Sequence, residues 1–327
     1  MSVEIIQSGL QTSFQNAGRN GYRALGIHPT GAMDQEALYL ANALVGNLDE
    51  RATLEIHFPG GRYLFHAEAC VSITGADFDP HIDGEPVDRN RLLRIAAGST
   101  LSFSRPIQGA RCYLAVAGGF ALEQWLRSDS TDLAASAGGW KGRALVKGDR
   151  IPLNQSIRFK TSSSFMPEIH IEEQITKGPV CILPGPEWNQ IPDNLKERFL
   201  QQSWTVTAQS NRMGLRLHGK ESIGLKLTSM ISAATEFGTI QCLPDGDLTV
   251  LMADHPVTGG YPRVAILPYY EWSRLAQAIP GTIFELQLTE HNEVHSKNLS
   301  YMAAGRMFRE TIRSAVQSYL QQHVIEC

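Results

Sequence analysis

One carboxylate, Asp254, stands between a strand pattern and a Gly-Gly loop in the most informative part of this sequence. The apolar residues 248–253 predict a buried strand, and two adjacent glycines follow at 259–260. Because no side chain shields the N–H groups of glycine, we expect the Asp254 carboxylate to lie beside exposed backbone donors. This arrangement is typical of a binding or catalytic site. The alternative is a tight turn that Asp254 merely caps.

A Pro-Asp-Gly turn at residues 244–246 precedes that strand pattern, and apolar runs flank the turn on both sides. Asp tolerates turn geometry, and Gly adopts positive φ without a steric cost. The sequence therefore predicts a β-hairpin whose second strand ends at Asp254.

The elements that must position these residues are mostly short strands separated by glycine turns. They are rich in β-branched or aromatic residues, and they cover residues 69–74, 92–96, 100–104, 112–117, 180–183, 204–208 and 283–288. Helices are few: Asp34 can cap one that ends at Gly46, and another covers residues 272–279. The sequence predicts a mainly β protein with a few short helices.

Composition indicates a globular chain large enough for two domains. It has 327 residues, of which 43% are hydrophobic and 19% charged, and its net charge is -4. Acids and bases are interspersed, which leaves no electrostatic footprint for nucleic acid or for an anionic membrane. No apolar run is long enough to span a bilayer, and the first residues lack a signal-peptide pattern. We expect a cytoplasmic protein that binds neither nucleic acid nor membrane.

Cysteines and histidines are arranged in ways that argue against a metal site. The five cysteines are scattered and include no Cys-x-x-Cys pair, which argues against a disulfide framework and against a zinc knuckle. The acids of residues 77–83 alternate, but no glutamate follows at the EF-hand distance. His57 and His66 lie in separate strand-like segments, where lone histidines are usually structural. We expect no metal.

Residues 214–221 have the spacing of a phosphate-binding loop until the last position. Glu221 stands there in place of the Ser or Thr that binds magnesium, and its carboxylate would repel phosphate. We therefore expect no nucleotide site in this segment.

The C-terminal residues 300–324 predict an amphipathic helix. Apolar side chains recur there at spacings of three to five residues, at Phe308, Ile312, Ala315, Tyr319 and Val324. Because such a stripe should not remain in water, we expect it to dock on the second domain of the chain or on a partner subunit.

Ordered motifs along the chain resemble the biotin-dependent carboxyltransferase family, also called the allophanate hydrolase subunit 2 family. They are QTSFQNAGR at 11–19, TGAMD at 30–34, ANALVGN at 41–47, YLAVAGG at 113–119, the glycine-rich 138–149, NRMG at 211–214 and DHPVTGGYP at 254–262. The resemblance extends to about residue 288. It implies two cyclophilin-like β-barrel domains.

We place the first of these domains at residues 1–160 and the second at 161–298, with a helical extension at 299–327. The polar stretch 155–172 is the best candidate for the boundary between the two domains.

This chain departs from the family pattern within several of the motifs. Arg127 and Asp129 stand where the family commonly has Gly and Arg. Phe237 replaces a common Gly, and His255 replaces a common Arg beside Asp254. These changes leave the identity of the substrate open.

The resemblance implies a set of site residues. The catalytic candidates are Asp254 and the backbone of Thr258, Gly259 and Gly260, whose N–H groups can form an anion nest. Arg212 can hold a substrate carboxylate with its planar fork, or it can pair with an internal acid. The remaining substrate-binding candidates are Gln15, Arg19, Gln241 and Tyr261.

Three functions follow from the resemblance. The first is a subunit of an ATP-dependent 5-oxoprolinase, which opens 5-oxoproline to glutamate with A-like and B-like (KipI-like) partner subunits. This chain would bind no cofactor tightly and would be inactive alone, because ATP would be used by the assembled complex. The second is a KipA-type regulatory protein that binds a kinase inhibitor. The third is a carboxyltransferase component of urea or allophanate metabolism, with biotin carried on a separate protein.

Overall fold

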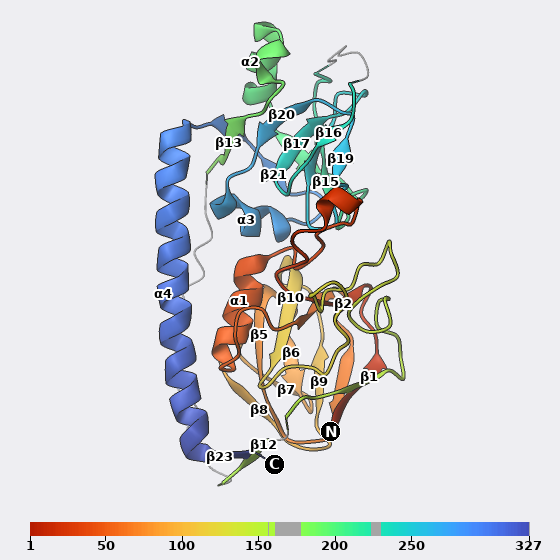
Figure 1. Ribbon diagram of the computed structural model, residues 1–327, viewed down its shortest axis with the longest axis vertical. Coiled ribbons are helices and arrows are strands. Elements are labelled where there is room, and N and C mark those ends of the chain that lie inside the picture. Colours follow the sequence, from red (N-terminus) through yellow and green to blue (C-terminus); the bar gives the residue numbers. More distant parts are fainter. Residues whose placement is uncertain (156, 161–177, 224–229, 327) are drawn as a thin grey trace. The chain divides into compact units, whose positions relative to one another are not determined.

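The computed structural model describes residues 1–155, 157–160, 178–223 and 230–326 (Figure 1). The chain divides into two compact units. Unit 1 comprises Met1–Arg19, Thr30–Glu173 and Gly305–Cys327, and unit 2 comprises Asn20–Pro29 and Gln174–Ala304. Most of the polar stretch 155–172 lies outside the described residues, so the domain ranges drawn from the sequence stay a prediction.

Unit 1 is a two-sheet β structure, which confirms the mainly β prediction. One sheet has the order β11-β1-β4-β9-β6-β7 and the other β2-β3-β10-β5-β8. The strands are β1 (Ser2–Gln7), β2 (Thr12–Gln15), β3 (Thr53–His57), β4 (Arg62–Phe65), β5 (Ala69–Asp77), β6 (Pro80–Ile82), β7 (Glu85–Pro86), β8 (Leu93–Ile95), β9 (Thr100–Phe103), β10 (Gln108–Val116) and β11 (Arg150–Pro152), with β12 (Ile157–Phe159) paired to β23 (Val324–Glu326).

Unit 1 has two hydrophobic cores, because successive side chains along a strand point to opposite faces of the sheet. In β10, Cys112 and Leu114 join residues of both sheets in one cluster, whereas Tyr113 and Ala115 belong to a second cluster with helix α1 (Gln35–Leu44). Helix α1 packs against β5 and β10, as the ribbon shows (Figure 1). The five-stranded sheet is therefore covered on both faces.

Helix α1 confirms the predicted cap and stop. The Asp34 carboxylate accepts a hydrogen bond from the Ala37 N–H at 3.1 Å. After the last turn, Gly46 has φ +76°, a conformation that favours glycine. Facing the helix from β5, Ser72 and Thr74 donate to helix carbonyls at 2.6 and 2.7 Å. The buried hydroxyls of Ser72 and Thr74 thus have hydrogen-bond partners, although no water reaches them.

Helix α4 (His291–His323) begins before the residues from which the sequence predicts it. In unit 1, Ile312 and Val316 enter the α1 cluster, and Leu320 is partly buried beside them. The expectation that this helix docks on the second domain or on a partner is corrected, because its apolar stripe belongs to the core of unit 1. Residues 312, 316 and 320 share one helix face. Of the predicted stripe, Ile312 is buried in this core and Tyr319 and Val324 are partly buried against it, whereas Phe308 and Ala315 are exposed.

Unit 2 contains an eight-stranded sheet that is nearly closed into a barrel. Its order is β21-β14-β15-β18-β17-β20-β13-β22, and the first and last of these strands are separated in the chain by Glu285 alone. The elements are η1 (Arg23–Leu25), β13 (Val180–Pro184), η2 (Trp188–Gln190), α2 (Asp193–Gln201), β14 (Trp204–Val206), β15 (Gly214–Gly219), β16 (Ala233–Ala234), β17 (Thr239–Cys242), β18 (Leu248–Leu251), β19 (Thr258–Gly259), β20 (Arg263–Ile266), η3 (Tyr269–Glu271), α3 (Trp272–Ala276), β21 (Ile283–Phe284) and β22 (Leu286–Leu288).

The predicted hairpin before Asp254 is confirmed, although its second strand ends at Leu251, three residues before Asp254. Strands β17 and β18 are antiparallel, with Gln241 opposite Thr249. Between them the Gly246 N–H donates to the Leu243 carbonyl at 2.9 Å, and Gly246 has φ +89°. The segment with the spacing of a phosphate-binding loop forms strand β15 instead, which supports its rejection as a nucleotide site.

Candidate functional site

Asp254 lies just beyond β18 and pairs with Arg212. Nε and Nη2 of the guanidinium donate to the two carboxylate oxygens, each at 2.8 Å. The Asp254 N–H also donates to the Arg212 carbonyl at 2.9 Å. The side chains are only 5% and 13% exposed, so the pair is largely removed from water. Of the two interpretations of Arg212, the structure shows the pairing with an internal acid. A role for either residue in binding substrate stays a prediction.

The first part of the Gly-Gly loop is a short strand. Thr258 and Gly259 form β19, which pairs with β16. Neither Gly259 nor Gly260 has φ in the left-handed region. An anion nest requires successive N–H groups to converge through a turn of alternating handedness. The backbone at Gly259 and Gly260 therefore does not have the nest geometry that the sequence suggested.

Gln241 is brought next to this loop by β17. Its Nε2 donates to the Tyr261 carbonyl at 3.4 Å, and a Cβ atom on Gly259 would lie 2.6 Å from that nitrogen. Gln241 is buried, whereas the Tyr261 side chain is 46% exposed. The Gln241 amide packs closely against Gly259. Unit 2 thus brings Gln241, the Gly-Gly loop and Tyr261 together, and their role in binding substrate stays a prediction.

A pocket of about 580 Å³ lies beside Thr258, within the range usual for small-molecule sites. Its lining comes from three separate parts of unit 2: Arg23, Ala24, Gly26, Ala234, Glu236, Val257 and Thr258. Among the predicted site residues, Thr258 lines this pocket. Arg23 supplies its cationic group and pairs with Glu236 at 3.2 Å. The pocket therefore combines one ion pair and one hydroxyl with a largely apolar lining.

His255 forms a buried neutral group near that pocket. Its Nδ1 lies 2.8 Å from the Pro256 carbonyl, which can only accept, so Nδ1 carries the proton. Burial lowers the pKa of His255 more than the hydrogen bond to the Pro256 carbonyl raises it, and electrostatic interactions with Arg23 and His28 act in the same direction as burial. The imidazole is thus neutral at neutral pH. Where the family commonly has a cationic arginine, this chain places an uncharged ring.

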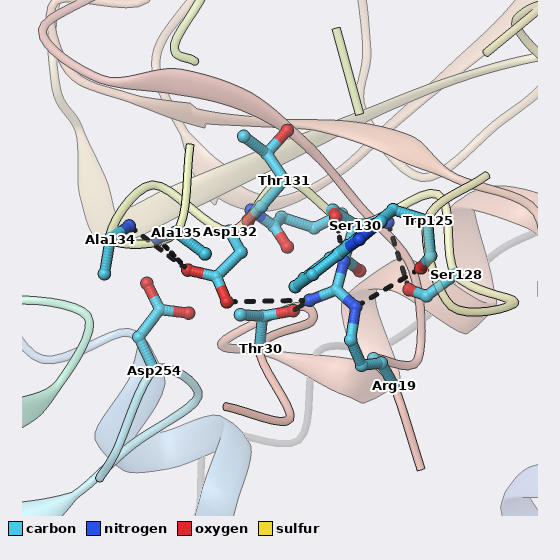
Figure 2. Close-up of polar contacts among 12 residues, drawn as sticks. Arg19, Thr30, Trp125, Ser128, Ser130, Thr131, Asp132, Ala134, Ala135 and Asp254 are labelled. Carbon is cyan, nitrogen blue, oxygen red and sulfur yellow. Dashed lines mark hydrogen bonds and ion pairs between the residues drawn. The ribbon is translucent and has the colours of Figure 1, made fainter. Parts of the chain in front are cut away.

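Arg19 is the centre of a buried polar cluster in unit 1 (Figure 2). Nη1 donates to the Thr30 hydroxyl at 2.7 Å, Nη2 to the Ser130 carbonyl at 2.6 Å and Nε to the Trp125 carbonyl at 3.4 Å. The guanidinium also lies 4.5 Å from the centre of the Trp125 ring, a cation–π contact. Every nitrogen of the guanidinium therefore has a protein partner. The predicted role of Arg19 in binding substrate stays a prediction.

The loop 126–132 completes this cluster. Asp132 accepts from the backbone N–H groups of Ala134 and Ala135 at 3.1 and 2.9 Å, and its other oxygen lies 3.9 Å from Arg19 (Figure 2). The Asn16 side-chain oxygen accepts from the hydroxyls of Ser128 and Ser130 at 2.9 and 2.6 Å. The motif at 11–19 and the loop 126–132 are thus joined by hydrogen bonds.

Gln15 occupies the same cluster and has one group without a partner. Its Nε2 donates to Ser13 Oγ at 2.9 Å and to the Thr131 carbonyl at 3.2 Å. Gln15 Oε1 and Thr131 Oγ1 are buried and, within the described part of the chain, accept or donate no hydrogen bond. Buried polar atoms are usually paired. Gln15 is therefore the residue of this cluster with the clearest capacity for a further polar contact.

Arg127, one of the departures from the family, lies in a strained turn. Leu126 and Arg127 have φ of 51° and 60°, and Trp125 and Ser128 exchange backbone hydrogen bonds at 3.0 and 3.2 Å. Such a two-residue turn requires positive φ at both central positions. Glycine, which the family commonly has here, adopts this conformation without a steric cost.

We expect Arg127→Gly to stabilise unit 1 by about 1 kcal/mol, because it removes the left-handed strain of a residue with a side chain. Thermal unfolding followed by circular dichroism measures the change. Lys147→Gly, at an exposed position without positive φ, is the matched control and should lower stability. A lower melting temperature for Arg127→Gly than for the unmodified chain would contradict the strain argument.

Sequence reasoning missed the contribution of the segment at residues 20–29. Arg23 joins unit 2 through its contacts with Thr235 and Glu236, although the flanking residues on both sides belong to unit 1. No motif or spacing links Arg23 to residues 234–258. His255 was visible in the sequence as a departure, but its burial was not.

Within the described ranges, no cluster of three or more His, Cys, Asp or Glu side chains is arranged to hold a metal ion. None of the helices in those ranges has the length and apolar character needed to cross a membrane.

Comparison with known proteins shows which family has this architecture. The model of the carboxyltransferase domain, subdomain A and B, matches residues 25–288. The chain is 35% identical over 275 residues to the C subunit of the 5-oxoprolinase of Escherichia coli (strain K12), covering 84% of this chain and 87% of that protein. It is 31% identical over 303 residues to the protein of the same name from Haemophilus influenzae, covering 92% and 96% of the two chains.

Larger proteins contain a related region. The urea amidolyase of Lachancea kluyveri is 28% identical over 97% of this chain, which spans only 18% of that protein. The crystal structure of the K. lactis urea amidolyase superposes with a TM-score of 0.77 at 24% identity, covering 97% of this chain and 20% of that one. Three observations support the same family: the fold, the residues that the family model matches, and the sequence identity to the two bacterial 5-oxoprolinase proteins. The chain therefore belongs to the carboxyltransferase domain, subdomain A and B, family.

Proposed function

We propose that this chain is the C-type subunit of an ATP-dependent 5-oxoprolinase and that it acts with A-like and B-like partner subunits to open 5-oxoproline to glutamate. The observation that carries this proposal is the 35% identity to the corresponding Escherichia coli 5-oxoprolinase protein over 84% of the chain. The 31% identity to the Haemophilus influenzae protein, over 92% of the chain, supports the same assignment.

The chemistry assigns this chain a role in binding and orienting the substrate. A lactam carbonyl is a poor electrophile, so its opening needs activation by ATP and stabilisation of the charge that develops on oxygen. The segment closest to a phosphate loop is strand β15, so we assign ATP use to the partner subunits. In unit 2, Arg23 and Thr258 line a pocket large enough for a small substrate.

Reconstitution tests the assignment. The purified full chain is assayed for glutamate formation from 5-oxoproline and ATP, alone and with A-like and B-like subunits. We expect no turnover alone and robust turnover in the mixture. Turnover by the single chain would contradict the need for partners. A complex that forms without turnover would contradict the enzymatic assignment in favour of the KipA-type regulatory function.

A second candidate is the carboxyltransferase step of urea or allophanate metabolism. It is favoured by the 28% identity to the Lachancea kluyveri urea amidolyase over 97% of this chain. In that case biotin would be carried on a separate protein. Carboxylation of urea by the chain with carboxylated biotin, and no activity on 5-oxoproline in the reconstituted mixture, would select this function.

The resemblance also supports finer proposals. We propose that both units are cyclophilin-like barrels, for which the nearly closed sheet of unit 2 is the supporting observation. We further place the protein in the cytoplasm, in a hetero-oligomer with its partner subunits, because the proposed reaction uses ATP and divides its steps among chains.

A further inference from the structure

The pocket beside Thr258 contains an arginine, Arg23, whose ion pair is exposed to water. Arg23 uses Nη2 to donate to the Thr235 carbonyl and Nη1 to pair with Glu236 Oε1 at 3.2 Å. The Arg23 side chain is 35% exposed, and that of Glu236 is 77% exposed. Ion pairs in such a position contribute little, because water screens them and both long side chains lose freedom. The Glu236 carboxylate can therefore leave Arg23 at little cost.

The other side of Arg23 is held firmly. Thr235, whose carbonyl accepts from Nη2, is buried. Its hydroxyl donates to the Pro256 carbonyl, and its N–H donates to the Val257 carbonyl at 3.1 Å. The Pro256 carbonyl also accepts from His255. This network holds Nη2 of the Arg23 guanidinium in place. Nη1, which now pairs with Glu236, is the nitrogen that a ligand in the pocket can contact.

The remaining lining suits a compact ligand with one carboxylate. Ala24, Ala234 and Val257 supply apolar contacts, and Thr258 supplies a hydroxyl. His255 is uncharged at neutral pH and adds no competing positive charge nearby. Arg23 is thus the cation that a ligand in this pocket would meet, and Glu236 is the acid that it must displace.

We propose that this pocket binds a small cyclic or short-chain monocarboxylate, whose carboxylate replaces Glu236 on Arg23. Glu236 holds the guanidinium in position until the ligand arrives. The preference for a carboxylate rests on the pocket alone. The choice of 5-oxoproline as that ligand rests on the proposed function.

Calorimetric titration of the isolated full chain tests this with three compounds: 5-oxoproline, cyclopentanecarboxylate and 5-oxoprolinamide, which lacks the carboxylate. We expect the two carboxylates to bind and the amide not to bind. Arg23→Gln should weaken carboxylate binding about tenfold or more, because it removes a charge-assisted contact. Glu236→Gln should strengthen it by up to about fivefold, because it removes the competing acid.

Arg216→Gln is the matched control. Arg216 is 32% exposed and pairs at 3.7 Å with the exposed Asp245, but it does not line the pocket. It should leave carboxylate binding unchanged. Equal binding of the amide and the carboxylates, equal losses in Arg23→Gln and Arg216→Gln, or weaker binding in Glu236→Gln would each overturn the proposal.

The reconstituted complex separates this inference from the proposed function. If the complex turns over 5-oxoproline and Arg23→Gln leaves KM unchanged, the pocket assignment fails while the function stands. If the complex is inactive on 5-oxoproline but the chain still binds cyclopentanecarboxylate through Arg23, the proposed function fails while the pocket stands.

Discussion

Removal of residues 305–327 is expected to unfold unit 1. These residues carry Ile312 and Val316, which are 4% and 0% exposed in the core shared with α1, and β23, which pairs with β12. Arg313 also donates to the Asn47 carbonyl at 2.6 Å. Loss of one large buried aliphatic group costs about 2–5 kcal/mol. Loss of the whole segment therefore approaches the total stability of an ordinary domain, about 5–15 kcal/mol.

Thermal unfolding and limited proteolysis of the chain truncated after Ala304 measure this effect. Two point variants on α4 provide a graded comparison. Ile312→Ala should cost about 2–5 kcal/mol. Phe308→Ala, at a side chain 44% exposed, should stay within about 0.5 kcal/mol. A truncated chain with an unchanged melting temperature that no longer binds a B-like subunit would show instead that the helix serves a partner.

Asp254→Asn is expected to destabilise unit 2 by about 3–5 kcal/mol. The substitution leaves the Arg212 guanidinium, 5% exposed, without the carboxylate that now satisfies two of its nitrogens. Removing one partner of a buried ion pair leaves an uncompensated charge, which costs more than the pair itself contributes. For domains of roughly 150–250 residues this corresponds to about 2–4 °C in melting temperature per kcal/mol.

A double-mutant cycle completes that experiment. Arg212→Met combined with Asp254→Asn should recover part of the loss, because no buried charge then remains unpaired. Glu221→Gln, which breaks the exposed pair with Arg198 at 3.2 Å, is the control and should cost at most about 1 kcal/mol. If Asp254→Asn keeps its melting temperature while the reconstituted complex loses turnover, Asp254 has a catalytic rather than a structural role.

The motif residues that carry the family resemblance mostly contact one another. Arg143 and Asp149 form two hydrogen bonds of 2.7 Å, and the hydrogen bonds from Arg143 lower the pKa of Asp149 to about 2. Arg212 is joined to Asp254 in the same way. Several charged residues that the resemblance suggests for substrate binding therefore already have protein partners. Arg23 and Glu236 are better candidates for contacting a ligand, because both side chains are exposed enough to exchange partners.

Local features of the fold could be predicted from the sequence because each depends on neighbouring residues. The cap of α1 needs only Asp34 and the N–H three residues later. The β17–β18 hairpin needs a turn in which Gly246 adopts positive φ. Alternation along β10 follows from the strand period of two. The mainly β class and the position of Asp254 at the end of a hairpin were accessible for the same reason.

The tertiary structure alone decided which side chains meet. The sequence determined that Arg212 and Asp254 are charged, but only the register of β15 with β18 brings them into contact and buries them. The helix near the C-terminus was visible in its periodicity, whereas its docking in unit 1 depends on a core built from residues far away in the chain. Arg23 reaches unit 2 for the same reason, because burial and pairing arise from contacts between distant segments that no local pattern encodes.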